Sequence, residues 1–347
     1  MLASALAASA EIKLNDNFST SAYVVGSYQY TTRTLQASGA GYTGSFKDDS
    51  LEVDAAKVLF NANFKPVSAQ VSFFYQPNQR VDVMDAFVTA DAGNGFTVSA
   101  GKFLSWLGFE SFDAPNMHQI SYANNDFLGA IPAYHTGVRA EYTTTDYGAG
   151  VAVVDSVYPG GYLKGDGELR FNHGVEGYFT YKGIQDITVF AGVAYESQRT
   201  TESYGAKHLT DNDPSIVTLD FWTSYQFDPA TLIAAEFVHK NGSAKGDRGY
   251  NWLFLTNRYF TEKFSAAFRV SAEHLEGYWE NRTTFVQRPN FVKLTVGPSY
   301  EVTRNLVIRG EVSRYSYSNR PYTDKDTGHA LNLNHSCYFG VQAIFKF

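Results

Sequence analysis

Apolar and polar residues alternate along most of this chain, in segments of about ten residues that begin near Phe18. Residues 56–64 read AKVLFNANF, residues 187–195 read ITVFAGVAY and residues 264–271 read FSAAFRVS. Successive side chains of an extended strand point to opposite faces, whereas a helix with this pattern would carry charges all around its surface. The pattern therefore predicts β-strands, each with one apolar face and one polar face.

The C-terminal stretch, residues 333–347, repeats this alternation and ends on an aromatic residue. It reads LNHSCYFGVQAIFKF, and its apolar face carries Phe339, Val341, Ala343, Phe345 and Phe347. A strand that ends on Phe in this way resembles the C-terminal signature of bacterial outer-membrane β-barrels. The resemblance implies that Phe339, Phe345 and Phe347 form a signal for the barrel-assembly machinery.

The joints between the predicted strands alternate in length. We count about sixteen strands, and one set of joints is short and rich in Pro, Gly and Asp, as tight turns are: 65–66, 91–95, 144–146, 182–185, 228–229, 261–262 and 303–304. The joints between these are mostly longer: 34–50, 104–133, 157–167, 199–213, 241–247, 277–289 and 319–331, with 77–80 as the exception. An up-and-down barrel has this alternation, and an even strand number lets its first strand pair with its last.

These features predict an all-β protein, a transmembrane antiparallel up-and-down β-barrel of about sixteen strands with short periplasmic turns and long external loops. Residues 11–347 form a single barrel domain, because no change of composition divides them. The first ten residues, MLASALAASA, end in small residues typical of a signal-peptide cleavage site, but a basic start is missing. We expect residues 1–10 to be a signal-peptide remnant, and a flexible terminus is the alternative.

Composition favours a membrane barrel and excludes several other classes of protein. Aromatic residues make up 16% of the chain, the mean hydropathy is -0.27, and no run reaches the ~18 apolar residues of a membrane helix. A soluble β-sandwich would share this composition but has no reason for alternating short and long joints. The net charge of -7 argues against a nucleic-acid partner. With one cysteine, Cys337, scattered histidines and no phosphate-binding Gly motif, the sequence predicts neither a metal nor a cofactor.

Residues 104–133 form the longest predicted loop, and they are apolar for a loop that faces solvent. A loop of this kind needs a surface to pack against, and the barrel interior is the nearest one. With the short 77–80 joint counted, it is the third joint of the long set, and this layout resembles that of general diffusion porins, whose third loop folds inward to narrow the pore. We therefore expect this loop to enter the lumen. Its large apolar residues are Trp106, Leu107, Phe109, Phe112, Tyr122, Phe127 and Leu128.

The motifs around this loop resemble the OmpL-like β-barrel porin family. They are Gly101-Lys102-Phe103, Gly108-Phe109-Glu110, Asn116, Phe127, Pro132 and His135-Thr136-Gly137-Val138. The likeness covers residues 95–155 best, with weaker likeness at 178–181 and in the C-terminal strand. It implies a passive channel for small hydrophilic solutes and ions, embedded in the lipid of a Gram-negative-type outer membrane. The short 77–80 joint departs from general porins, where that loop latches a neighbouring subunit, so a homotrimer and a monomer both stay open.

Between Lys102 and Arg139 the loop's formal charges are all acidic, namely Glu110, Asp113 and Asp126. In the lumen they would form an acidic lip at the constriction, and rings of Asp or Glu favour cations. We expect a field between this lip and a basic wall, centred on Glu110, Asp113 and Arg139. Alternatively, a wet barrel interior needs polar residues of both signs anyway. The alternation of inward and outward positions along each predicted strand places the following residues on the pore wall: Lys57, Arg139, Glu141, Arg170, Glu176, Glu196, Asp220, Glu236, Lys240, Arg269, Glu273, Lys293, Arg309 and Glu311.

Two other functions are weaker candidates. Aromatic residues beside the short turns fit girdles at the membrane boundary, and a stacking track for sugars is the alternative: Tyr142, Tyr147, Phe179, Tyr181, Tyr225, Phe227, Tyr259 and Phe264. His173 and His274 fall on the apolar face, where an imidazole is costly, but neither has a Ser partner that we can place, so no enzyme is predicted. The leading hypothesis is a porin with a mild cation preference. The alternatives are a plugged barrel that serves as an adhesin or structural anchor, and a substrate-selective channel, for instance for sugars.

Overall fold

The computed structural model describes residues 11–37, 43–76, 80–123, 128–158, 174–196, 215–242, 248–279, 285–286, 290–318, 321–323 and 330–347. Residues 1–10, Asp126 and Arg170 therefore lie outside the described residues. Within the described part, no helix is long and apolar enough to cross a membrane.

One antiparallel sheet of eighteen strands closes on itself, and sixteen of these strands are long. β1 (Ile12–Lys13) and β19 (Pro321–Thr323) are short additions to it, and β15 (Tyr278–Trp279) pairs with β16 (Phe285–Val286) in a separate hairpin. The long strands are β2 (Phe18–Ala37), β3 (Thr43–Phe64), β4 (Val67–Gln76), β5 (Arg80–Gly93), β6 (Phe96–Leu104), β7 (Tyr134–Thr143), β8 (Tyr147–Val154), β9 (Gly174–Ile184), β10 (Ile187–Glu196), β11 (Ile216–Asp228), β12 (Thr231–Gly242), β13 (Arg248–Tyr259), β14 (Phe264–Leu275), β17 (Asn290–Thr303), β18 (Leu306–Ser318) and β20 (Ala330–Lys346).

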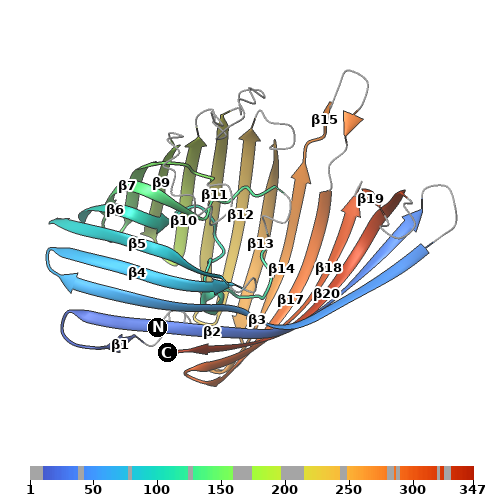
Figure 1. Ribbon diagram of the computed structural model, residues 1–347, viewed down its shortest axis with the longest axis horizontal. Helices are drawn as coiled ribbons and strands as arrows, with labels where there is room; N and C mark the ends of the chain where they lie inside the picture. Colours follow the sequence, from blue (N-terminus) through green and yellow to red (C-terminus); the bar gives the residue numbers. More distant parts are fainter. Residues whose placement is uncertain are drawn as a thin grey trace.

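The first long strand pairs with the last, as predicted. Val24 lies opposite Phe345 and Tyr30 opposite Phe339 in the β2–β20 pair, so the sheet has no unpaired edge along this seam. Figure 1 shows β2 between β3 and β20. An open edge would leave backbone N–H and C=O groups unpaired in hydrocarbon, at several kcal/mol for each group, so closure is what allows the sheet to sit in a membrane.

The two faces of the sheet differ as the alternation predicts. Along β17, Val292, Leu294 and Val296 are 44%, 48% and 49% exposed, whereas Lys293 and Thr295 between them are 0% and 1% exposed. The apolar outer face suits lipid, and the polar residues point to the interior. The three aromatic residues of the C-terminal signature, Phe339, Phe345 and Phe347, are exposed on the outer face.

The aromatic residues beside the short turns mostly lie on the outer face. Tyr142, Tyr147 and Phe179 are exposed and adjacent, with ring centroids 6.0 and 6.4 Å apart. Such rings form a girdle at the membrane boundary and cannot line the pore as a sugar track. Tyr259 is an exception, because it lines an opening inside the barrel at the short-turn end.

The short turns match the prediction to within three residues, because Pro, Gly and Asp mark where they lie. Gly93, Asn94 and Gly95 have φ of 85°, 53° and 82°, and Asp91 Oδ1 accepts a hydrogen bond from Gly93 N at 2.8 Å. A Cβ at Gly95 would lie 2.1 Å from the Thr143 carbonyl oxygen, so only glycine fits there. At the other end, one expected loop is shorter than predicted. The predicted joint 34–50 contains the ends of two strands, because β2 continues to Ala37 and β3 begins at Thr43.

Candidate functional site

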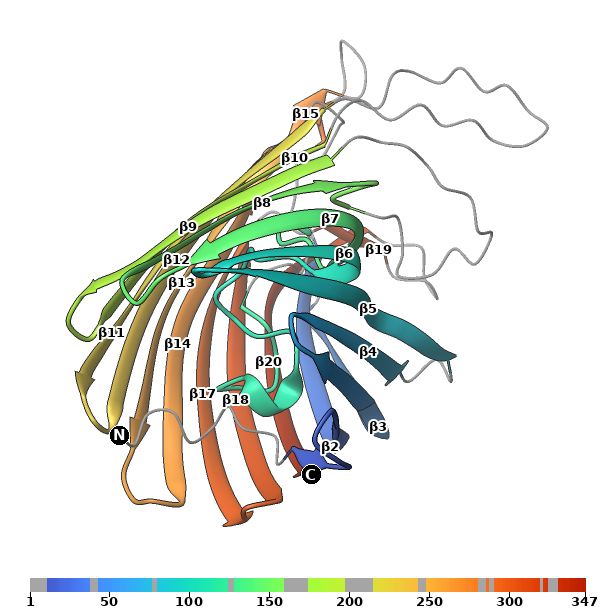
Figure 2. The ribbon, with the colours of Figure 1, turned by 90° about the vertical axis from the view of Figure 1, so that its left-hand side faces the viewer.

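The third loop lies inside the barrel, as its apolar composition predicts. It connects β6 to β7 and contains the single 3-10 turn that the described residues hold, η1 (Ala114–Asn116). Figure 2 shows this segment within the ring of strands. Phe112 contacts Phe74 of β4 with ring centroids 5.8 Å apart, and Phe109 contacts Trp222 of β11 at 5.6 Å. The loop therefore reaches opposite walls of the lumen.

Carboxylates of the inner wall accept hydrogen bonds from backbone amides of this loop. Glu176 accepts from Trp106 N at 2.7 Å, Asp220 from Gly108 N at 2.7 Å and Glu236 from Phe109 N at 2.6 Å. On the other side, Glu311 accepts from Ile120 N and Ser121 N at 2.7 and 2.8 Å, and Glu273 accepts from Leu128 N at 2.9 Å. A loop that crosses a lumen has no neighbouring strand for its N–H groups, and these buried carboxylates replace that partner.

Cations of the inner wall complete the attachment. Arg269 forms an ion pair with Glu110 and donates to the Ser121 carbonyl oxygen at 2.8 Å. Lys57 Nζ lies 3.1 Å from Asp113 and 3.3 Å from Asp85. Three further wall cations bond to loop carbonyl oxygens: Lys293 to Tyr122 at 2.8 Å, Arg309 to Ala114 at 3.0 Å and Lys240 to Leu128 at 3.2 Å.

The structure thus brings together some of the predicted site residues and separates others. Glu110 meets Arg269 and Asp113 meets Lys57 in direct contact, so the loop carboxylates do not stand free of the basic wall. Arg139 lies apart from both. Its guanidinium carbon lies 4.5 Å from the centre of the Phe103 ring, and its Nε lies 3.4 Å from Glu141.

Two cavities flank the loop. One of ≈ 310 Å³ is lined by residues of the loop itself together with Glu236, and one of ≈ 520 Å³ lies between the loop and the wall formed by β2, β3, β18 and β20. Phe112 and Tyr122 line both. The Tyr122 hydroxyl donates to the Phe112 carbonyl oxygen at 2.8 Å and so forms a bridge between the two cavities.

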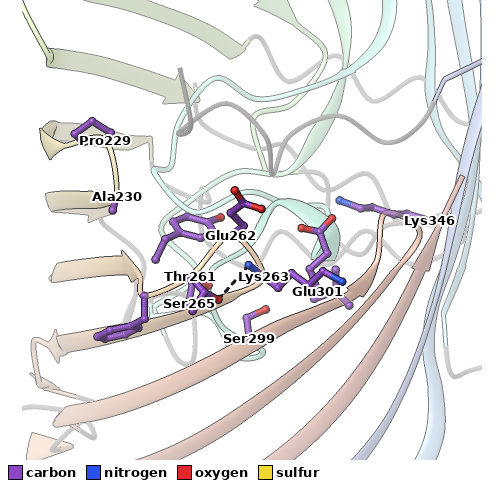
Figure 3. Close-up of a pocket in the computed structure, with 12 residues that line it drawn as sticks. Pro229, Ala230, Thr261, Glu262, Lys263, Ser265, Ser299, Glu301 and Lys346 are labelled. Carbon is purple, nitrogen blue, oxygen red and sulfur yellow. Dashed lines mark hydrogen bonds between the residues drawn. The ribbon is translucent and has the colours of Figure 1, made fainter.

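A third cavity, of ≈ 160 Å³, lies at the short-turn end of the barrel. Its lining includes Glu262, Lys263, Glu301 and Lys346, and Figure 3 shows these side chains around one opening. Charges of both signs therefore line this end, so the opening itself has little preference for either sign.

Sequence reasoning missed two carboxylates that line the larger cavity, Asp54 and Glu52. Asp54 lies where the β2–β3 pairing shifts register between Val25 and Gly26. Strict alternation from the inward-facing Lys57 would place Asp54 on the outer face, because it does not allow for this shift. A β-bulge of this kind leaves little signal in the sequence. Glu52 lies beyond the bulge, inside the predicted strand.

Among the described titratable groups outside the strands, His118 on the loop has the pKa that its surroundings shift most. Burial, and then the positive charge of Arg309, lower the pKa of His118 to about 4. The imidazole is therefore neutral above that pH. Within the described residues, no group of three or more His, Cys, Asp or Glu side chains is placed to hold a metal ion.

A family model described as beta-barrel porin-2, OmpL-like, matches residues 17–347. The chain belongs to this family of porins. It is an outer-membrane barrel of the porin type, located in the bacterial outer membrane. No relative is found among curated proteins.

Solved porins share the fold of this OmpL-like family member at low sequence identity. OprB of Pseudomonas putida is 11% identical, with a TM-score of 0.64, over 95% of this chain and 94% of that one. OmpF of Salmonella typhi, solved in complex with daunomycin, is 12% identical, with a TM-score of 0.64, over 97% and 100%. An anion-selective porin of Comamonas acidovorans is 8% identical, with a TM-score of 0.60, over 95% and 100%. At these identities the likeness establishes the fold alone.

Proposed function

We propose that this porin-family barrel is a passive diffusion channel for small hydrophilic solutes and ions, with a mild preference for cations. The observation that carries the proposal is a closed barrel with a polar interior whose third loop leaves cavities of ≈ 310 and ≈ 520 Å³ beside it. A loop held inside a lumen narrows the passage without filling it. Solutes larger than the space beside the loop would be excluded.

The cation preference rests on which carboxylates lack a cationic partner. Glu110 pairs with Arg269, and Asp113 shares Lys57 with Asp85, so each of the two loop carboxylates has a cation in direct contact. Asp54 and Glu52 line the larger cavity, and in the part of the chain that the structure describes no Lys or Arg lies within ion-pair distance of either. Carboxylates left unpaired in a narrow aqueous passage attract cations.

Planar-bilayer recording tests the channel function. The proposal predicts stepwise conductance in KCl. The double variant Glu110→Gln, Asp113→Asn should shift the reversal potential toward anions, because Arg269 and Lys57 keep their charges after their partners lose theirs. Asp146→Asn together with Asp49→Asn is a control with the same change of net charge, because both carboxylates are exposed and line none of the three cavities. An unchanged reversal potential in the loop double variant would remove Glu110 and Asp113 from the selectivity mechanism.

A second candidate function is a plugged barrel that acts as an adhesin or anchor. The bonds from the loop to wall carboxylates on β9, β11, β12, β14 and β18 favour it, because a loop held on so many strands does not move aside easily. Correctly folded protein that stays silent in bilayers would support this alternative.

We also propose a homotrimer. OmpT of Vibrio cholerae, solved in a trimer form, has the same fold, with a TM-score of 0.57 at 12% identity over 96% of this chain and 100% of that one. Mass measurement of the detergent-solubilised protein, corrected for bound detergent, tests this. A mass of one chain would contradict it.

A further inference from the structure

The cavity of ≈ 160 Å³ at the short-turn end of the barrel lies between neighbouring strands. β13 ends at Tyr259, and Glu262 and Lys263 lie in the turn that follows it. Glu301 lies near the end of β17, and β20 ends at Lys346. Two acidic and two basic side chains therefore surround one small opening (Figure 3).

These four charged side chains do not neutralise one another. Among the residues that the structure describes, none of the four forms an ion pair or a side-chain hydrogen bond. Glu262 and Lys263 are exposed, so water can solvate their charges. Glu301 is half-buried and Lys346 is buried, so these two charges have less access to water. A ligand in the cavity would gain most by contacting this second pair.

Lys346 is the buried cation of the group. The residue is 4% exposed, yet its amino nitrogen bonds to no described residue and keeps contact with the open space of the cavity that it lines. Figure 3 shows this nitrogen directed into the opening. A buried ammonium group is costly unless an acceptor, preferably a charged one, lies against it. Lys346 is therefore placed to pair with an anionic group that enters the cavity.

The strand order keeps Glu301 apart from Lys346. Glu301 lies opposite Val307 in the β17–β18 pair, and β18 in turn pairs with β20. Two strand spacings of about 4.8 Å, or roughly 10 Å, therefore separate the backbones that carry the two charges. Val307 is 5% exposed and provides an apolar floor between them. The cavity thus holds a carboxylate and an ammonium group on either side of a short apolar gap.

Neutral hydroxyl groups complete the lining on the Glu301 side. Ser299 lies opposite Ser265 in the β14–β17 pair, and Tyr259 lies opposite Ser265 in the β13–β14 pair. A hydroxyl group can donate or accept a hydrogen bond, so these three side chains can bond to either charged group of a solute. The lining therefore suits a polar solute that carries charges of both signs.

We propose that this cavity binds a small zwitterion, such as a free amino acid, with its carboxylate against Lys346 and its ammonium group against Glu301. An inorganic ion carries one charge and compensates only one of these two residues. A zwitterion compensates both, and its carbon atoms lie over the Val307 side chain. The role of the site as a station on the solute path rests on the proposed channel function, whereas the binding itself does not.

Ligand-detected NMR titration of the full chain, folded in detergent micelles, tests the proposal without relying on conductance. The probes are alanine and two analogues that each lack one charged group, ethylammonium chloride and sodium propionate. We expect each analogue to bind about tenfold more weakly than alanine, because one hydrogen bond between charged groups is lost. Lys346→Met should weaken alanine binding about tenfold and leave ethylammonium binding unchanged. Lys182→Met is the control, since Lys182 is exposed near the short turn after β9 and does not line this cavity.

Glu301→Gln provides the test if Lys346→Met does not fold. It should weaken alanine binding about tenfold and leave propionate binding unchanged. Equal binding of alanine and either analogue, alanine binding by Lys346→Met that equals that of the unaltered protein, or no alanine binding at all would each overturn the proposal. A protein that conducts KCl but gives one of these results would contradict the zwitterion site alone. One that binds alanine as expected but stays silent in bilayers would contradict the channel alone.

Discussion

Glu311 and Asp54 are carboxylates on neighbouring parts of one inner wall, yet they have opposite partners. Glu311, on β18, accepts hydrogen bonds from the backbone amides of Ile120 and Ser121 in the loop. Asp54, on β3, accepts hydrogen bonds from Ser27, Gln29 and Gln342 of the wall and none from the described part of the loop. Carboxylates of the first kind attach the loop, whereas those of the second kind leave their charge to the solute. The role of a wall carboxylate therefore depends on whether the loop passes close enough to bond to it.

Glu311→Gln should have the largest effect, because it weakens the attachment of the loop to the wall. The neutral amide cannot replace a buried carboxylate that accepts from two loop amides and from the Ser313 hydroxyl at 2.6 Å. We expect the loop to detach on this side, at a cost of about 3 kcal/mol in stability, with a higher single-channel conductance. Protease cleavage within residues 104–133, compared between this variant and the unaltered protein, measures the detachment. Asp54→Asn is the matched control, and equal protection of the loop in all three proteins would show that Glu311 does not hold it.

A smaller effect should follow from Tyr122→Phe, which tests the boundary between the two cavities. The change removes the hydroxyl that donates to the Phe112 carbonyl oxygen and keeps the ring. One hydrogen bond contributes about 1 kcal/mol, so the bridge should open more often and the open-channel current should become noisier. Tyr250→Phe, on the outer face, is the control. Identical current noise in Tyr122→Phe and the unaltered channel would mean that this bridge does not limit the passage.

The smallest effect concerns pH. The pKa of His118 is lowered to about 4 from an ordinary value of 6.5, so the docked loop binds fewer protons than the undocked loop between these values. Loop docking should therefore weaken as the pH falls from about 6.5 toward 4 and should not change above 6.5 on account of this group. Protease protection of the loop as a function of pH measures this. In His118→Asn, the protection should change less between pH 6.5 and pH 4 than it does in the unaltered protein. A profile that is the same in both proteins would exclude His118.

The sequence alone predicts the barrel because the rule behind it is local. Alternation assigns a face to each residue, so Lys293 and Arg309 could be placed on the inner wall from parity. The apolar residues of the third loop likewise require a surface to pack on, and Phe109 and Phe112 find it on opposite walls. Strand faces and the loop's location therefore follow from periodicity and composition.

The partners inside the lumen could not be predicted in this way. Which wall cation meets Glu110 depends on the path of the loop across the lumen, and backbone amides, which occupy Glu176 and Glu311, carry no side-chain signal. Asp54 was missed for a different reason, because the register shift beside Gly26 interrupts the strict alternation on which the prediction of inward-facing residues depends. Long-range paths and single bulges are the features that a periodic pattern does not encode.

The zero-current potential of the unaltered protein across a KCl gradient tests the central claim most directly. If the carboxylates of the loop are compensated and those beside the larger cavity are not, the potential should have the sign of K⁺ permeation, and Asp54→Asn should bring it closer to zero. A potential with the sign of Cl⁻ permeation, or one that Asp54→Asn leaves unchanged, would contradict the claim that unpaired wall carboxylates set the selectivity.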